Sequence, residues 1–330
     1  MDRVIISGIS GQDGIFLTSK LFSLNKNMKI YGISRNINNP DFYKKLTRIN
    51  KNSNINNVQL INTKLFNYNE AYKLISDLKP SFIFNLAGPS SVSESINNEK
   101  YYKVHLEDSF DNIANTVISL NLKTKIFQAS SSEMFDYSEG RLNEQSILKP
   151  RNPYSNSKYK IHIKIQNLRK KSGLNVSSGI MFNHESEFRS EKFLMMSIIQ
   201  NALKIKSKEL KNFKIGSIDY VRDWSFAGDI MEAVIKVMQQ DVLEDFVLGS
   251  GKGTQVKKLL EYVFSFLNLN WEEYVIIDKT ILRKNDPLSI VSNPTKILNK
   301  IGWKVEMDIE NLLFRMLDNI KSSNNGINCG

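Results

Sequence analysis

The first half of the chain alternates short apolar runs with longer amphipathic segments. The apolar runs predict buried strands at residues 4–8, 29–34, 59–61, 82–87 and 125–129. Between them, apolar residues recur at helical spacing, for example in segments 15–22, 69–78 and 107–120. Strands that alternate with helices form a parallel sheet covered by helices, and ligands bind beyond the carboxyl ends of its strands. The sequence therefore predicts an α/β fold with a Rossmann-type doubly wound parallel sheet.

Beyond about residue 175 the alternation of strands and helices becomes irregular. We expect residues 1–175 to form a cofactor-binding Rossmann domain, to which a later segment, roughly 212–240, returns. Residues 176–330 would then form mainly a smaller α/β substrate-binding domain. The length of 330 residues is about twice that of a typical domain and agrees with two unequal lobes.

Composition narrows the function classes. No apolar run approaches the roughly 18 residues of a membrane span, and the single Cys329 offers no disulfide framework, so we expect a cytoplasmic protein without a membrane partner. The net charge of +11 raises the question of nucleic acid, but the lysines are spread along the chain and predict solvated helix surfaces. We expect no nucleic-acid partner, although a positive potential would attract an anionic substrate such as a nucleotide sugar.

The histidines are too few and too scattered to suggest a metal site. They stand at His105, His162 and His184, far apart in the sequence. We therefore expect no catalytic metal.

A glycine-rich turn follows the first predicted strand. Glycines recur at every third position, with Ser10, Gln12 and Asp13 between them, at Gly8, Gly11 and Gly14. Where no Cβ intrudes, backbone amides at a helix N-terminus can approach a pyrophosphate. An ordinary tight turn is the alternative, but the position between the first strand and the first helix favours a dinucleotide site.

The residue after the second predicted strand distinguishes the two nicotinamide cofactors. An acid there would hold a ribose 2′-hydroxyl, whereas a cation accepts a 2′-phosphate. The chain has Arg35 at this place and no acid nearby, which favours NADP over NAD. The alternative is that Arg35 is only a surface residue.

Tyr154 and Lys158 are four residues apart, after Pro153, a residue that favours the first turn of a helix. Side chains at i and i+4 share one helix face. An ammonium near a phenol stabilises the phenolate, so we expect a pKa of Tyr154 lowered towards neutrality and a phenolate able to take a hydroxyl proton while a hydride leaves. Such a pair is common by chance, but its position after the fifth strand favours a catalytic role.

Glu133 follows the fifth predicted strand, two residues after Ser131. A carboxylate there can remove the proton α to a newly formed ketone, or protonate a leaving hydroxyl. The alternative is a strand-end residue that caps the next element. Together with Tyr154 and Lys158, the carboxylate predicts dehydration rather than simple oxidation.

These motifs together resemble the extended short-chain dehydrogenase/reductase family and, more closely, its GDP-mannose 4,6-dehydratase group. The likeness runs in order from about residue 3 to residue 317. Further strings that match the group lie at residues 85–88, 128–133, 150–154, 182–186, 222–224, 293–296 and 302–303.

The resemblance implies an NADP-dependent 4,6-dehydration of GDP-mannose to GDP-4-keto-6-deoxymannose. Tyr154, with Lys158, takes the O4 proton while the C4 hydride passes to NADP. Glu133 then removes the C5 proton, water leaves from C6 and the hydride returns to C6. Ser131 stands at a family threonine and keeps the hydroxyl that bonds O4.

The resemblance also assigns binding residues and an assembly. It implies that the cofactor contacts Leu86, Ala87, Tyr154, Lys158, His184 and Arg189, besides the glycine-rich turn and Arg35. It implies substrate contacts from Ser90, Ser132, Asn183, Arg222, Arg283 and Asp286. A homodimer or homotetramer is expected.

Departures from the group leave other functions open. A basic pair near the base is replaced by Met196 and Ser197, and Lys64 stands where the family has an acid. These changes motivate a dehydratase of another nucleotide sugar, for example a GDP-heptose. An NADPH-dependent reductase of a 4-keto-6-deoxy sugar and a non-catalytic nucleotide-sugar binder are the further alternatives.

Overall fold

A computed structural model describes residues 2–282 and 286–325. Its largest sheet has seven parallel strands, which are β1 (Arg3–Ser7), β2 (Lys29–Ile33), β3 (Val58–Ile61), β4 (Phe82–Asn85), β5 (Lys125–Ser131), β7 (Val176–Met181) and β11 (Phe246–Leu248). Their order is β11-β7-β5-β4-β1-β2-β3, so the chain reverses direction across the sheet between β1 and β4. The five strands expected from the sequence and the doubly wound parallel sheet are confirmed.

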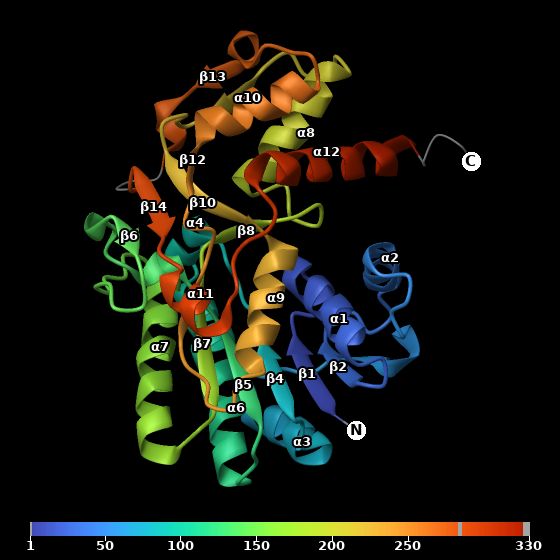
Figure 1. Cartoon of the computed structure of the whole chain (residues 1–330), viewed down its shortest axis with the longest axis vertical. Helices are drawn as coiled ribbons and strands as arrows, with labels where there is room; N and C mark the ends of the chain where they lie inside the picture. The colour runs from blue at the N-terminus through green and yellow to red at the C-terminus, as the bar shows by residue number, and fades with distance from the viewer. Residues whose placement is uncertain (1, 283–285, 326–330) are drawn as a thin grey trace.

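Helices cover both faces of this sheet (Figure 1). One face carries α1 (Gln12–Leu24), α2 (Pro40–Ile49) and α9 (Ala227–Met238), and the other carries α3 (Tyr68–Leu78), α6 (Ser109–Ser119) and α7 (Pro153–Ser172). Successive residues of β1 divide between the two cores, because Val4 and Ile6 face α1 and α9 whereas Ile5 faces α3 and α6. Burial on both faces explains why these strands are apolar throughout.

A smaller lobe lies beyond the carboxyl ends of the sheet (Figure 1). Its strands are β6 (Arg141–Leu142), β8 (Asn183–Glu185), β9 (Phe213–Ile215), β10 (Val221–Phe226), β12 (Gly253–Gln255), β13 (Val275–Ile277) and β14 (Ser289–Ser292). The order of its larger sheet is β12-β10-β14-β6, with β8 beside β10, and β9 pairs with β13. Its helices are α8 (Leu194–Lys206), α10 (Val256–Phe266) and α12 (Ile309–Asn325), whereas α11 (Thr295–Ile301) packs against β11 of the main sheet.

Two strands beyond residue 175, β7 and β11, also pair into the main sheet. Helix α9, which falls in the expected returning segment 212–240, packs against α1. The division into a cofactor domain and a substrate domain stays a prediction.

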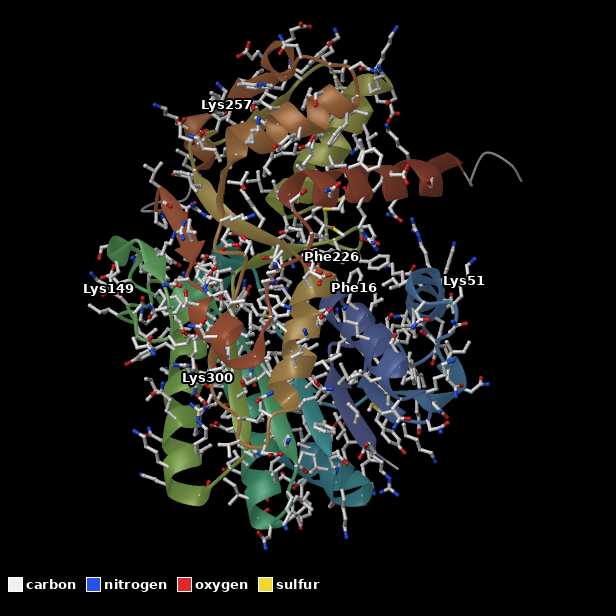
Figure 2. All side chains as sticks on the ribbon, in the orientation of Figure 1. Phe16, Lys51, Lys149, Phe226, Lys257 and Lys300 are labelled. Atoms are coloured by element: carbon white, nitrogen blue, oxygen red, sulfur yellow. The ribbon has the colours of Figure 1, made fainter. Side chains whose placement is uncertain are left out.

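One aromatic contact joins the lobes at the top of α1. Phe16 of α1 and Phe226 at the end of β10 meet edge to face, with ring centroids 5.0 Å apart (Figure 2). Phe188, from the loop after β8, lies 5.7 Å from Phe16. The apolar core under α1 and α9 is therefore continuous with the core of the smaller lobe.

Within the described residues, no helix is both long and apolar enough to cross a membrane. Figure 2 labels four lysines, and they lie in four separate parts of the molecule: Lys51, Lys149, Lys257 and Lys300.

Candidate active site

The four residues expected to be catalytic lie together where β5 ends and α7 begins. β5 ends at Ser131, and a 3₁₀ turn, η3 (Ser132–Met134), carries Glu133 just beyond it. α7 begins opposite, because Asn152 and Ser155 form a capping box and Pro153 occupies the first turn. Tyr154 is thereby placed against β5, with its phenol near Ser131 and Glu133, and both of these residues act on its pKa.

Tyr154 does not have the lowered pKa expected from the sequence. Burial raises its pKa to about 12, and this effect outweighs the hydrogen bond with Ser131, which acts in the opposite direction. The ring is 8% exposed. In the protein alone the phenol is therefore protonated, and Ser131 is the neighbour that most favours its ionisation.

Lys158 is bonded to the main chain of β5. Its ammonium donates a hydrogen bond to the Ala129 carbonyl oxygen at 2.6 Å and lies 5.7 Å from the ring centroid of Tyr154. The side chain is buried, which lowers the pKa of Lys158 to about 8. The ammonium is thus held near the phenol but is not hydrogen-bonded to it.

Glu133 is held from two sides. Its backbone N–H donates to the Ser131 hydroxyl at 3.2 Å, and its carboxylate oxygen Oε2 accepts a hydrogen bond from the Tyr137 hydroxyl at 3.1 Å. Ser132, expected to bind substrate, is buried in the same turn. The hydroxyl of Ser131 therefore organises both the carboxylate segment and the phenol of Tyr154.

A buried chain of amides crosses the sheet below these residues. The Ser7 hydroxyl of β1 donates to Asn85 of β4 at 2.7 Å, and the Asn85 amide donates to Gln128 of β5 at 2.7 Å. Gln128 in turn donates to the Ala129 carbonyl oxygen at 3.0 Å, which Lys158 also uses. The position of the ammonium is therefore tied to the strand ends at the point where the strand order reverses.

The glycine-rich turn fits a dinucleotide. It joins β1 to α1, and Gly11 is the N-cap of α1. A Cβ on Gly8, whose φ is +73°, would lie 3.0 Å from the Ala87 nitrogen, and one on Gly14 would lie 2.4 Å from the Cα of Ile9. Only glycine allows the strand, the turn and the helix to approach so closely, which leaves backbone amides exposed at the helix N-terminus.

Residues of the turn reach the smaller lobe. Asp13 lies 3.1 Å from His184 Nε2, and Gln12 bonds both the His184 carbonyl oxygen and the Ser186 hydroxyl, at 2.9 Å each. Burial alone would raise the pKa of Asp13, but His184 lowers it below its ordinary value. Burial alone would lower the pKa of His184, but Asp13 raises it. The two side chains therefore stabilise each other as an ion pair.

Asp13 also keeps an acceptor for a ligand. Its Oδ1 is buried and accepts no hydrogen bond from the described parts of the chain. An orphaned carboxylate oxygen beside a glycine-rich turn is suited to a hydroxyl group of a bound nucleotide.

Arg189 follows β8 and faces the same region. Its Nε lies 3.3 Å from Glu185 Oε2, and its guanidinium lies 3.4 Å from the ring centroid of Phe193. Burial raises the pKa of Glu185, and the charge of Arg189 opposes this effect. The Arg189 charge also acts on Tyr154, so this arginine lies near the candidate catalytic residues.

Two of the expected substrate residues pair with each other. Arg222, on β10, lies 3.1 Å from an Asp286 carboxylate oxygen and donates to the Val221 carbonyl oxygen at 2.9 Å. The charge of Arg222 acts on Tyr137, which hydrogen-bonds Glu133, so this arginine lies near the same carboxylate. Arg283 lies outside the described residues.

The remaining expected contacts occupy loops at the strand ends, except Asn183, which begins β8. Leu86 and Ala87 follow β4, and the Ala87 N–H donates to the Ser7 hydroxyl at 3.0 Å. Ser10 donates to the Ser34 hydroxyl at 3.1 Å, which ties the glycine-rich turn to the loop after β2. Three residues are exposed and form no hydrogen bond or ion pair through their side chains with other described residues: Arg35, Ser90 and Asn183.

Sequence patterns did not point to Tyr137 or to the Gln128 amide. Tyr137 stands four residues after Glu133 in the sequence. Its hydroxyl reaches Glu133 through a short 3₁₀ turn that the hydrophobic pattern does not show. Among the described residues, no three His, Cys, Asp or Glu side chains gather to hold a metal ion.

Comparison with known proteins agrees with this geometry. The family described as GDP-mannose 4,6 dehydratase matches residues 5–316. The chain belongs to the GDP-mannose 4,6-dehydratase family. The expected resemblance is confirmed, and with it an enzyme of the nucleotide-sugar 4,6-dehydratase class. One relative, GDP-mannose 4,6 dehydratase 1 of Arabidopsis thaliana, is 31% identical over 321 residues, which cover 95% of this chain and 88% of the relative.

Solved structures share the fold of this family member. The dTDP-glucose 4,6-dehydratase DesIV of Streptomyces venezuelae, with NAD and TYD bound, matches with a TM-score of 0.83 at 16% identity, over 98% of each chain. RMD from Pseudomonas aeruginosa, complexed with NADPH, matches with a TM-score of 0.79 at 18% identity, over 98% of this chain and all (100%) of the other.

Proposed function

We propose that this chain catalyses the NADP-dependent 4,6-dehydration of GDP-mannose to GDP-4-keto-6-deoxymannose. The observation that carries the proposal is the meeting of Ser131, Glu133, Tyr154 and Lys158 at one end of the sheet. A simple dehydrogenase has no use for Glu133 beside the phenol, whereas a dehydration needs a second proton acceptor. Membership of the family supports the same reaction.

The cofactor is proposed to lie across the carboxyl ends of β1 and β4. The pyrophosphate would rest on the amides from Gly8 to Gly14, including those of Ser10, Gln12 and Asp13, with Leu86, Ala87, His184 and Arg189 around the rest of the molecule. When bound, NADP supplies the chemistry of accepting a hydride from the sugar C4 and returning it to C6. Arg35, exposed at the end of β2, would bond the 2′-phosphate that distinguishes NADP from NAD.

Tyr154 is proposed to take the proton of the sugar O4 hydroxyl. Ser131 would bond the same oxygen, and it lies near the phenol, where it favours ionisation of Tyr154. Lys158 lies near the ring with its charge fixed by Ala129, and it stabilises the phenolate as the proton is transferred.

Glu133 is proposed to remove the C5 proton, which a carbonyl group at C4 makes acidic. The C5–H and C6–O bonds break, a C5=C6 double bond forms, and the proton taken by Glu133 is passed to the departing C6 hydroxyl, which leaves as water. When a hydride then adds at C6, C5 takes up a proton, and the O4 proton held by Tyr154 balances it, so that one water is lost overall. The hydrogen bond from Tyr137 keeps the carboxylate oriented during this step.

The nucleotide is proposed to lie in the smaller lobe. Arg222 offers a guanidinium that can bond phosphate oxygens in a bidentate way, and Asn183 lies on β8 beside β10. Ser90 and Ser132 would bond the sugar, and Asp286 and Arg283 the nucleoside. Since Arg222 is paired with Asp286, the nucleotide would have to share or replace that ion pair.

The test is mass spectrometry of GDP-mannose incubated with the protein and a catalytic amount of NADP, beside a parallel tube with a GDP-heptose. Loss of one water from GDP-mannose without net change of cofactor supports the proposal. Loss from the heptose alone would favour a different sugar. Net oxidation of NADPH with a 4-keto-6-deoxy sugar, and no dehydration, would indicate a reductase.

We also propose that the enzyme works in the cytoplasm as a homodimer or homotetramer. Light scattering at several protein concentrations measures the assembly, and a mass of one chain throughout would contradict it.

A further inference from the structure

Beside the proposed catalytic carboxylate lies a phenol that no sequence motif identified. The Tyr137 hydroxyl donates to Glu133 Oε2 at 3.1 Å. Tyr137 opens a second 3₁₀ turn, η4 (Tyr137–Glu139), and this turn brings the ring back towards η3. The hydroxyl is thus directed at the catalytic group by the fold of the main chain.

The ring of Tyr137 is itself held. The guanidinium of Arg151 lies 4.3 Å from the ring centroid, and the same guanidinium lies 3.3 Å from an Asp136 carboxylate oxygen. Asp136 also caps η4, by accepting a hydrogen bond from the Ser138 N–H at 3.2 Å. Since Arg151 directly precedes the cap of α7, this cluster joins the segment of Glu133 to the segment of Tyr154.

The Tyr137 hydroxyl stays a donor over the working range of pH. Burial, followed by the charge of Glu133, raises the pKa of Tyr137 well above its ordinary value, and Arg151 and Arg222 offset only part of this. A hydroxyl that donates to an ionised carboxylate forms a stronger bond than one between neutral groups. It therefore fixes the position of the acceptor oxygen.

We propose that Tyr137 is a positioning residue that orients the Glu133 carboxylate for removal of the sugar C5 proton. The inference rests on the proposed function and adds to it a prediction about a single step. Tyr137 contacts Glu133, whereas Ser131 is the residue that contacts Tyr154. Loss of the Tyr137 hydroxyl must therefore slow the loss of water and leave the oxidation at C4 nearly unchanged.

The experiment uses Tyr137→Phe, with Tyr262→Phe in α10 as a matched loss of one phenolic oxygen far from the site. GDP-mannose is mixed with the NADP-loaded enzyme, and two signals are followed: the absorbance of reduced nicotinamide, and the loss of water by mass spectrometry. For Tyr137→Phe we expect C4 oxidation within about twofold of the original rate and dehydration slowed about 10- to 100-fold, so that reduced nicotinamide accumulates. Tyr262→Phe should change neither signal.

A second variant covers the case in which Tyr137→Phe lowers the melting temperature. Arg151→Lys keeps a positive charge near Asp136 but removes the planar group over the ring, and it should show the same uneven slowing to a smaller degree. Unchanged dehydration in Tyr137→Phe, or equal slowing of both steps, would overturn the inference. Absence of both signals in the unaltered chain would instead contradict the proposed function, and the inference with it.

Discussion

The Lys158 ammonium donates its hydrogen bond to the Ala129 carbonyl oxygen at 2.6 Å, while the ring centroid of Tyr154 lies 5.7 Å from the same nitrogen. The ammonium is therefore anchored to β5, and Gln128, which bonds the same carbonyl, helps to fix it. The charge of Lys158 is therefore held near the phenol, although burial of the ammonium costs free energy.

Lys158→Met is expected to abolish turnover and to stabilise the folded protein at neutral pH. Burial lowers the pKa of Lys158 to about 8 from 10.5, so the unfolded chain binds more protons between these values, and the free energy of unfolding of the unaltered protein rises with pH there. Below pH 8 the buried charge is a cost that methionine removes. Chemical denaturation from pH 7 to 9.5 should show a difference between the two proteins that shrinks as pH rises. A constant difference would mean that the ammonium is not desolvated.

The Glu133→Gln variant should bind GDP-mannose normally. Its rate of dehydration should fall by at least about 100-fold, because an amide cannot accept the C5 proton. The amide can still accept the hydrogen bond from Tyr137, so the turn should keep its shape. Titration calorimetry measures binding, and mass spectrometry measures the loss of water. Near-normal turnover would remove Glu133 from the mechanism.

Arg35→Ala should weaken the binding of NADP by about 10-fold or more and leave the binding of NAD nearly unchanged, because only NADP carries the 2′-phosphate. Arg35 is exposed, so the substitution should not alter stability. Fluorescence titration with both cofactors makes the comparison, and Arg3→Ala, at the opposite end of the sheet, is the control. Equal weakening of both cofactors would show that Arg35 does not read the 2′-phosphate.

Local patterns predicted much of the fold and the meeting of the candidate catalytic residues at one end of the sheet. The apolar runs gave five strands, because a strand buried on both faces is apolar throughout, and the spacing of Gly8, Gly11 and Gly14 marked the turn between β1 and α1. Ser131 and Tyr154 meet because both stand at element ends that a parallel sheet brings together.

Contacts between residues far apart in the sequence could not be predicted from local patterns. The pKa of Tyr154 is set first by burial, and Lys158 is held by the Ala129 carbonyl oxygen; the i, i+4 spacing reveals neither. Arg222 was expected to face the nucleotide, but its pairing with Asp286 joins segments 64 residues apart in the chain. The same holds for Asp223, whose partners come from the loop after β11 and from β14.

Asp223→Asn should destabilise the smaller lobe by about 3 kcal/mol or more. This carboxylate is 1% exposed and accepts hydrogen bonds from the N–H groups of Ser250, Gly251 and Ser292 and from both serine hydroxyls. An amide offers one acceptor oxygen in place of two, which leaves several donors buried without a partner. Thermal unfolding measures the loss, and Asp219→Asn, an exposed neighbour, should be neutral. Equal effects would mean that the buried network does not depend on the charge.

His184→Gln should reduce stability most strongly at mildly acidic pH. The pKa of His184 is raised in the folded protein, so its contribution is complete below about 6.5 and is lost as pH rises through the raised value. The pKa of Asp13 is lowered, so its contribution is complete above about 3.8 and is lost as pH falls through the lowered value. The ion pair is therefore fully formed between these limits, where removing the imidazole should cost about 1 to 3 kcal/mol. Denaturant unfolding of both proteins at pH 5 and pH 8.5 measures the difference, and His105→Gln, at a half-buried histidine that bonds the Tyr101 carbonyl oxygen, controls for general effects of protonation. A loss as large at pH 8.5 as at pH 5 would show that His184 acts through packing, and not through its charge on Asp13.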